Sequence, residues 1–499
     1  GKEAYTLHLL SANEHSTTMF KPEVVSDVQR QQRAINEQFQ RELEKEQRIK
    51  YDLMSEEEKN QQQEAEHFGD IVSAYNYYGT HSFERFARKE ADFKRLIPRY
   101  QNLMPGFLPR MSDIRTAIVK NHFFIRQVTA NTEIFLNGQA QNIVRREKEK
   151  LPTEHNMDKV RSTLRQCSRD WSSEGFPERE QCYGPILNEL KERFPIFEER
   201  QHLRVLNPGC GMGRLTWEIA NLGFQSQGNE FSYFMLLASH MILNRSQKDQ
   251  HTLYPFIHET TNVLKISHQL RQVVLPDVDP YSLPSQSKFS MSAGDFLEVY
   301  SEKENFGMWD VVSACFFIDT AHNVIQYFEC ISRILKPGGL FINFGPLLFH
   351  YADMPNELSI EISYEELRPT LEYCGLKIVK EEFDLPSKYA SNKYSMLQMT
   401  YRCIFLVCVR VPDAPIDRLE PKPFDESVRQ GGVTNTVSVE PSAAQSADNE
   451  AAHQRYHEQS DRRDVRDLHH HHSHSSSPRR EHPESSSASS LSTESHQHQ

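Results

Sequence analysis

A glycine-rich turn between two apolar runs is the feature that most constrains how this chain can fold. The segment from Leu203 to Glu230 reads LRVLNPGCGMGRLTWEIANLGFQSQGNE. Its first run is typical of a buried strand, and a helix with apolar residues at helical spacing follows the turn. Gly209, Gly211 and Gly213 lack side chains, so the backbone there can approach a ligand closely. The second run ends at Glu230, whose carboxylate can accept hydrogen bonds from both ribose hydroxyls, so the segment predicts a nucleoside site.

The spacing of these glycines indicates which nucleoside binds. A dinucleotide site has the pattern G-x-G-x-x-G and seats a diphosphate on the helix N-terminus. Here the third glycine comes one residue early, and Arg214 takes its place. This disfavours an NAD-dependent oxidoreductase and favours S-adenosylmethionine, which has no phosphate. For the turn alone, an ordinary tight connection between a strand and a helix is the alternative interpretation.

The overall composition excludes several classes of partner. The chain has a net charge of −12 and contains no basic stripe with interleaved aromatic residues, so we do not expect nucleic acid to bind. No apolar run approaches the roughly 18 residues of a membrane span. The first residues, GKEAYTLHLLSANEHS, lack the charged and apolar regions of a signal peptide. We therefore predict neither nucleic acid nor a membrane as a partner.

The eight cysteines are scattered along the chain without a C-x-x-C pair. Several stand in apolar runs, which is typical of small buried residues rather than of disulfide partners or zinc ligands. We therefore predict no metal site and a reducing compartment, cytoplasmic and nuclear.

Two regions precede the glycine-rich segment. Residues 1–66 are predicted to be a charged arm, helical or flexible, because residues 25–66 are dense in Gln, Glu, Arg and Lys with few apolar anchors. A coiled coil is the alternative, but the arm has no sustained a/d repeat. Residues 67–200 are predicted to form an all-helical region of three or more helices. Its apolar stripes are Phe68, Ile71, Val72 and Tyr75; Ile114, Ile118, Ile125 and Val128; and Met157, Val160, Leu164, Cys167 and Trp171.

Residues 201–412 alternate between strand-like and helix-like runs, which predicts parallel pairing in an open α/β sheet. Residues 311–318 and 340–344 are predicted strands, with a helix over 324–335 between them. The last two runs, LKIVKEEFDL and TYRCIFLVCVRV, have no helix between them, so they should pair antiparallel. An insert at 249–286 is predicted to be irregular because of its prolines and acids.

Residues 413–499 change character and are predicted to be a disordered Ser/His-rich tail. They are low in complexity, with almost no aromatic residues, and include the run His469–His472. Such sequence cannot bury enough apolar surface to offset the entropy of ordering. The histidine run could bind Ni²⁺ or Zn²⁺ weakly, but a solvated polar tract is the favoured interpretation.

The predicted site lies beyond the C-terminal ends of the strands, where ligands bind in an open α/β sheet. The glycine turn, Glu230 and the pair Asp295-Phe296 each follow a predicted strand and should meet there. Asp295 can accept a hydrogen bond from the exocyclic amine of adenine, while Phe296 covers the ring. An antiparallel final pair of strands is also how methyltransferases that use S-adenosylmethionine close their sheet.

Several unusual segments closely resemble the carnosine N-methyltransferase family. They are NPGCGMGRLTWEIA, LPDVDPYSLP, FSMSAGDF, CFFIDTAHNVI, ILKPGG and GPLLFHYADMPNELSIEISYEE, and the similarity runs from about residue 67 to residue 411. The resemblance implies a class I methyltransferase (Rossmann-like) domain with a helical N-terminal part. It also implies methylation of the imidazole ring of histidine, at the pros nitrogen, in carnosine and related small peptides. Members of the family have also been linked to histidine in proteins.

The resemblance implies roles for individual residues at positions that match the family's motifs. The glycine turn reads PGCGMG where PGAGLG is expected, which is a small departure. The implied substrate contacts are Asp319, His350 and Tyr401. The implied S-adenosylmethionine contacts, with Gly211 of the turn added to them, are Gln166, Arg169, Gly209, Gly211, Glu230, Asp295, Phe296 and Cys315.

The chemistry of methyl transfer gives the substrate residues a physical rationale. Transfer from a sulfonium is an in-line displacement that needs a neutral nitrogen lone pair held close and dry. A hydrogen bond to one imidazole nitrogen decides which lone pair is free. Asp319 could accept the N–H of the distal nitrogen and stabilise the imidazolium that forms, so we predict that it is catalytic. We expect His350 and Tyr401 to bind and orient the substrate.

Two other functions are kept open by the sequence. A protein-histidine methyltransferase would use the same chemistry on a larger substrate. A scaffold would bind the cofactor without catalysing any reaction. Retention of Asp319 and of the glycine turn disfavours the scaffold. The expected partners are a small histidine-containing peptide or histidine in a protein, and we expect a homodimer.

Overall fold

The computed structural model describes residues 50–130, 132 and 151–418, together with scattered positions between 33 and 45. Most of the predicted arm and nearly all of the predicted tail therefore lie outside the described residues. In the described part, no helix is long and apolar enough to cross a membrane. The described residues divide into two compact units, and the second contains only residues 320–323 and 349–361.

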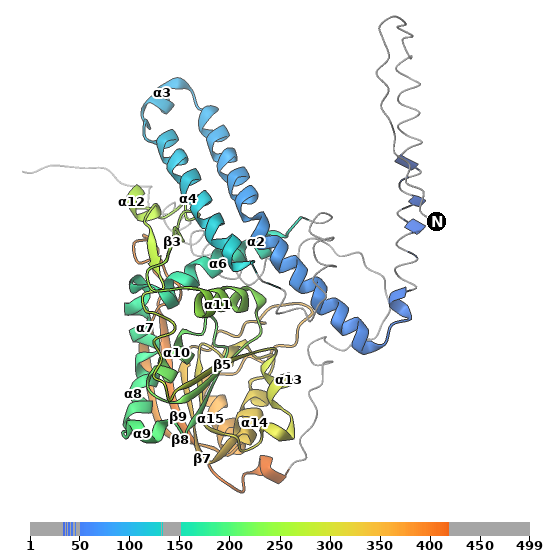
Figure 1. Cartoon of the computed structure of the whole chain (residues 1–499), viewed down its shortest axis with the longest axis vertical. Helices are drawn as coiled ribbons and strands as arrows, with labels where there is room; N and C mark the ends of the chain where they lie inside the picture. Colours follow the sequence, from blue (N-terminus) through green and yellow to red (C-terminus); the bar gives the residue numbers. More distant parts are fainter. Residues whose placement is uncertain are drawn as a thin grey trace, which may run out of the picture. The chain divides into compact units, whose positions relative to one another are not determined.

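The N-terminal region of the first unit is helical, as predicted (Figure 1). Its long helices are α2 (Glu56–Lys94), α4 (Phe107–Val128) and α6 (Glu154–Trp171), and the short α3 (Pro98–Asn102) lies between α2 and α4. Ser55 caps α2 in a capping box with Glu58, so this helix begins inside the predicted arm. Burial on α2 begins at Phe68, and all three predicted apolar stripes are buried. The amphipathic pattern therefore located this core correctly.

A seven-stranded sheet follows, with the strand order β5-β2-β1-β6-β7-β9-β8. All neighbouring strands pair parallel except at β9, which pairs antiparallel with both β7 and β8. The predicted antiparallel pair of final strands is confirmed. This order, with only the last strand reversed, is that of the class I methyltransferase fold. The strands are β1 (Arg204–Pro208), β2 (Gln225–Glu230), β5 (Lys288–Ala293), β6 (Trp309–Cys315), β7 (Leu335–Gly345), β8 (Leu376–Ser387) and β9 (Tyr401–Arg410).

Helices cover both faces of the sheet. On one face, Ile186 of α8 (Gly184–Arg193) and Ile219 of α10 (Arg214–Asn221) pack with Val205 of β1 in one apolar cluster. On the other face, Phe328 of α14 (Val324–Ile334) contacts Phe341 of β7. Other helices in the described part of the chain are α7 (Phe176–Cys182), α9 (Phe197–Arg200), α11 (Tyr233–Arg245), α13 (Phe296–Tyr300) and α15 (Tyr364–Tyr373). Alternating strands and helices thus produce a doubly covered sheet.

The insert at 249–286 is more regular than predicted. It contains the antiparallel strands β3 (His251–Leu253) and β4 (Val273–Leu275) and the short helix α12 (Ile266–Gln269). Its buried apolar residues Leu253, Ile257 and Leu275 belong to the core that the N-terminal helices form. The prediction of an irregular insert was wrong for these three short elements, because a few apolar residues suffice for pairing when a neighbouring core covers them.

The predicted start of the disordered tail, at residue 413, was also wrong. The short 3-10 helix η5 (Pro415–Arg418) is ordered, and Ala414 and Ile416 are buried. Arg410 at the end of β9 forms an ion pair with Asp417. Residues 414–418 are therefore ordered, because two apolar side chains and one ion pair hold this turn against the domain.

Candidate cofactor and substrate site

The glycine turn after β1 has the backbone conformation that its sequence requires. Gly209, Gly211 and Gly213 have φ angles of +62°, +55° and +76°, a region in which residues with a side chain are strained. A Cβ at Gly209 would stand 2.6 Å from the ring of Phe317. A Cβ at Gly211 would meet only Gln166 Oε1, at 3.9 Å, so this glycine keeps one side of the turn open.

Glu230 at the end of β2 is coupled to the turn. Its Oε2 accepts a hydrogen bond from the Gly211 amide at 2.7 Å, and its Oε1 accepts one from the Ser232 amide at 2.8 Å. Burial raises the pKa of Glu230, and these backbone amides oppose the rise. A carboxylate has about four lone-pair sites, so acceptor capacity remains. Glu230 is not among the lining residues of the pocket beside the turn, and its contact with ribose hydroxyls stays a prediction.

A pocket beside the turn brings five of the predicted cofactor residues together. They are Gln166, Arg169, Gly209, Gly211 and Cys315. They come from α6, the turn and the end of β6, which are far apart in the sequence. The other lining residues are Asp170, Tyr183, Asn207, Cys210, Leu215, Phe316 and Tyr389.

Arg169 is the buried cation of this pocket. Its Nη1 donates to Asp170 Oδ1 at 2.6 Å and to the Tyr183 hydroxyl at 2.9 Å. The guanidinium carbon lies 4.7 Å from the centre of the Tyr389 ring. Burial alone would lower the pKa of Arg169, but the charges around it raise that pKa well above its ordinary value. The arginine is therefore a fixed positive charge at the pocket wall.

The predicted pair Asp295-Phe296 lies at the start of α13. Asp295 Oδ1 caps this helix by accepting from the amides of Leu297 at 2.9 Å and Glu298 at 3.3 Å. Phe296 is 3% exposed. Neither side chain is among the lining residues of the pocket beside the turn. Their adenine contacts stay predictions.

An aromatic contact connects this pair with the turn. The Phe317 ring packs edge-on against Phe296 at 5.4 Å between centroids. The same ring fills the space that Gly209 leaves by having no side chain. The absence of a side chain at Gly209 is therefore needed by the protein's own packing.

The predicted strand over 311–318 ends earlier than predicted, at Cys315. The reason is Phe316, which has a φ of +54°, a strained conformation for a residue with a side chain. The turn places Cys315 and Phe316 on the pocket wall. Strained residues of this kind cluster at functional sites, and a pattern of buried residues cannot reveal them.

Asp319 and Tyr401, two of the three predicted substrate residues, lie near each other. Asp319, in the 3-10 turn η4 (Ile318–Thr320), is 2% exposed, and its Oδ2 accepts from the Leu348 amide at 2.9 Å. Burial raises the pKa of Asp319 to about 7, although the Leu348 hydrogen bond favours the charged form. Burial, and next the charge of Asp319, raise the pKa of Tyr401. Tyr401 also contacts the Phe316 ring, at 5.7 Å between centroids.

His350, the third predicted substrate residue, belongs to the second compact unit. In that unit His322 stacks on Tyr351 at 3.6 Å between ring centroids, and its Nδ1 lies 2.8 Å from the Leu358 carbonyl oxygen. A substrate contact of His350 stays a prediction.

The sequence analysis missed several residues of the pocket, among them Phe316 and Tyr389. Tyr389 comes from the connection between β8 and β9. Its hydroxyl donates to Gln166 Oε1 at 3.5 Å, and its ring lies 4.9 Å from that of Phe316. Phe316 stands in the quoted run CFFIDTAHNVI, but no spacing marked it or Tyr389 as part of a site.

The arrangement fits a cofactor with polar ends. The turn leaves space where Gly211 has no side chain, Glu230 accepts a hydrogen bond from the Gly211 amide, and Arg169 and Gln166 line the pocket beside the turn. Among residues 50–130 and 151–418, no group of histidine, cysteine and acidic side chains is arranged to hold a metal ion. The carboxyl of Asp319 is buried, and its charge acts on Tyr401, which contacts Phe316 of the pocket wall.

The chain is similar in sequence to proteins of one known family. The family model for carnosine N-methyltransferase matches residues 146–412. The carnosine N-methyltransferase of Rattus norvegicus is 43% identical over 353 residues, which cover 70% of this chain and 87% of that protein. That of Dictyostelium discoideum is 39% identical over 363 residues, covering 69% and 77%. Among solved structures, a SAM-dependent methyltransferase from Aquifex aeolicus is 12% identical at a TM-score of 0.28, covering 47% of this chain and 94% of that chain.

Proposed function

The chain belongs to the carnosine N-methyltransferase family, and on that premise we propose what it methylates and how. The proposed reaction is transfer of a methyl group from S-adenosylmethionine to the pros nitrogen of the histidine ring in carnosine and related small peptides. The products are anserine-type peptides. The observation that carries this proposal is the buried carboxyl of Asp319 near an aromatic ring, Tyr401, that contacts the pocket residue Phe316.

The pocket residues have distinct tasks in holding the cofactor. When bound, S-adenosylmethionine supplies the methyl group on a sulfonium. Glu230 would accept hydrogen bonds from ribose hydroxyls, and the open side of the turn at Gly211 would admit the nucleoside. Arg169 would hold a carboxylate, for which a planar guanidinium is well suited. Phe316 and Tyr389 would exclude water from the reacting centre.

Asp319 would orient the substrate ring and hold its proton. As a carboxylate it accepts the N–H of the distal ring nitrogen, which leaves the pros lone pair free to form the new N–C bond. The ring becomes an imidazolium in the reaction, and the nearby negative charge stabilises it. Because the pKa of Asp319 is about 7 and that of an imidazole is roughly 6.5, the proton can be shared between them at small cost. Tyr401 would line the side of the ring.

The test is a methyl-transfer assay with labelled S-adenosylmethionine, in which carnosine and a cell extract are offered separately. We expect label in carnosine, and nuclear magnetic resonance should place it on the pros nitrogen. Label only in proteins of the extract would move the function to protein histidine. Label in neither, with cofactor binding shown by calorimetry, would contradict an enzyme and support a scaffold.

Replacing the proposed catalytic carboxylate should separate chemistry from binding. Asp319→Ala is expected to lower kcat by at least about 100-fold, since it removes both orientation and charge stabilisation. Its Kd for S-adenosylmethionine, measured by titration calorimetry, should stay within about twofold, because Asp319 is not among the residues of the cofactor pocket. An equal loss of cofactor affinity would contradict the role assigned to Asp319.

A further inference from the structure

The connection between β8 and β9 forms one wall of the cofactor pocket. We call residues 388–397 the strap. Tyr389 of the strap lines the pocket, donates to Gln166 Oε1 at 3.5 Å and lies under the Arg169 guanidinium at 4.7 Å. Tyr389 is thus the point at which the strap touches groups predicted to hold the cofactor.

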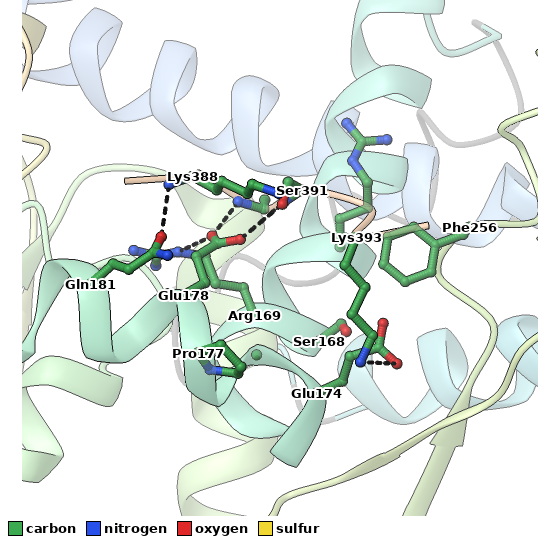
Figure 2. Close-up of a pocket in the computed structure, with 13 residues that line it drawn as sticks. Ser168, Arg169, Glu174, Pro177, Glu178, Gln181, Phe256, Lys388, Ser391 and Lys393 are labelled. Carbon is green, nitrogen blue, oxygen red and sulfur yellow. Dashed lines mark hydrogen bonds and ion pairs between the residues drawn. The ribbon is translucent and has the colours of Figure 1, made fainter. Parts of the chain in front are cut away.

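Glu178 of α7 fastens the strap beside Tyr389. Its Oε1 accepts from the Ala390 amide at 2.5 Å, and its Oε2 accepts from the Ser391 amide at 3.2 Å and the Ser391 hydroxyl at 3.3 Å. Figure 2 shows this carboxylate between α7 and the strap, in a second pocket that Arg169 also lines. A carboxylate that accepts three hydrogen bonds from one short segment fixes the position of that segment.

The same carboxylate contacts Arg169. Glu178 Oε1 lies 2.9 Å from Arg169 Nε, but the N–H does not point along this line, so the contact is an ion pair and not a hydrogen bond. Both side chains are largely buried, at 5% and 11% exposed, so water screens their attraction little. One acidic group therefore contacts the cationic wall of the pocket directly, and holds the aromatic wall through Ala390 and Ser391, the two residues that follow Tyr389.

The strap is held in a strained conformation at this point. Ala390 has a φ of +48°, in the left-handed region that alanine rarely adopts. Such a conformation persists only where surrounding contacts impose it. At this position the Ala390 and Ser391 amides donate hydrogen bonds to the Glu178 carboxylate, and these contacts hold the backbone in that conformation.

The far end of the strap is held independently by the insert. Tyr394 stacks on His268 at 4.5 Å between centroids, and the Met396 amide donates to the Asn262 carbonyl oxygen at 2.8 Å. Loss of the Glu178 contacts should therefore release only the near end of the strap, which carries Tyr389.

We propose that Glu178 is a positioning residue that holds Arg169 and Tyr389 in place across the cofactor pocket. It acts through these two residues and has no part in the methyl transfer itself. The inference rests on the proposed function in one respect, namely that the pocket takes S-adenosylmethionine. Without the carboxylate, two strap amides lose their acceptor, and the Tyr389 ring must be ordered by the cofactor when it binds, which weakens binding.

The experiment uses the full chain and two independent readouts. The first is the rate of trypsin cleavage after Lys388 and Lys393, read by mass spectrometry. The second is the Kd for S-adenosylmethionine and S-adenosylhomocysteine by calorimetry. The variants are Glu178→Ala and the isosteric Glu178→Gln, and the matched control is Glu180→Gln, an exposed acid on the same helix.

We expect Glu178→Ala to speed cleavage after Lys388 about tenfold or more and to weaken cofactor binding about 10- to 100-fold. Glu178→Gln keeps one acceptor oxygen, so its cleavage rate and its Kd for the cofactor should lie between those of Glu178→Ala and those of the unaltered chain. Glu180→Gln should equal the unaltered chain in both readouts. At saturating cofactor, kcat of Glu178→Gln should stay within about threefold, because Asp319 is untouched.

Three results would overturn the inference: unchanged cleavage and affinity in both Glu178 variants, equal losses in Glu180→Gln, or a fall in kcat without a change in cofactor affinity. If circular dichroism shows that Glu178→Ala does not fold, Glu178→Gln and Ser391→Ala carry the test, with smaller changes expected in the same direction. If the unaltered chain binds no cofactor, the proposed function fails, and the cleavage rates alone still decide whether Glu178 holds the strap.

Discussion

At the residue scale, burial sets the protonation of Asp319. The side chain is 2% exposed, and the loss of hydration raises its pKa from 3.8 to about 7. The folded protein therefore favours the protonated carboxyl, whereas the proposed reaction uses the carboxylate. Stability from this group is fully present below its unfolded pKa and is lost as the pH rises through about 7.

Asp319→Asn should stabilise the protein at alkaline pH while abolishing methyl transfer. The asparagine keeps an acceptor oxygen for the Leu348 amide and does not titrate. The difference between pKa values of 3.8 and about 7 corresponds to at most about 4 kcal/mol in the free energy of unfolding.

Urea unfolding of both proteins at about pH 4 and about pH 8 measures this effect, because the titration of other groups cancels in the difference. The advantage of the asparagine variant should be larger at the higher pH. An advantage of equal size at both pH values would show that the folded pKa of Asp319 is not raised.

The sequence revealed local features of the site better than it revealed long-range contacts. Gly209 and Glu230 stand in one segment whose pattern predicts their roles. Glu178 and Ala390, by contrast, meet across 212 positions, and no periodicity links them. Tyr389 was missed for the same reason, since its role follows from its contacts with Gln166 and Arg169, which are far from it in the sequence.

At the element scale, the glycine turn combines two requirements. Gly211 keeps space open on the side of the pocket, whereas Gly209 makes room for the ring of Phe317. The sequence pattern predicted the first use and not the second. Phe317 then packs on Phe296, so the turn and the start of α13 depend on one aromatic contact.

Gly209→Ala should therefore destabilise the protein as well as weaken cofactor binding. The new Cβ would lie 2.6 Å from Phe317 at a φ of +62°. We expect a loss of roughly 1–3 kcal/mol in the free energy of unfolding, from backbone strain alone. Gly184→Ala is the matched control, since its Cβ meets nothing within 4 Å and its position opens helix α8.

Chemical unfolding and calorimetry with S-adenosylmethionine should show both losses in Gly209→Ala and neither in Gly184→Ala. Normal stability in Gly209→Ala would mean that Phe317 moves aside without cost.

At the scale of the whole molecule, the alternation of strands and helices was enough to predict an open sheet with a reversed last strand. The order of the strands follows from right-handed parallel connections, which the sequence does not state. Two boundaries were misjudged. The insert forms strands because its apolar side chains pack into the core of the N-terminal helices. The residues just after 413 are ordered because Ile416 is buried.

The second boundary can be tested by truncation. A chain ending at Arg418 should keep the melting temperature and turnover of the full chain. A chain ending at Pro412 exposes the site where Ile416 is buried and leaves Arg410 without its Asp417 partner, so it should lose about 2 kcal/mol or more. Thermal unfolding compares the two truncated chains directly. Equal stability of both would show that η5 contributes nothing, and a loss in the longer one would show that residues 419–499 take part.

The position of β9 has a consequence for how the protein is made. This strand, although last in sequence, lies between β7 and β8 and provides the partner that β8 needs. Domains form from the N-terminus as the ribosome extends the chain. A nascent chain therefore carries the glycine turn long before residues 401–410 emerge to fasten β8 and the strap that follows it. The wall of the pocket that carries Tyr389 is therefore completed only after residues 401–410 have emerged.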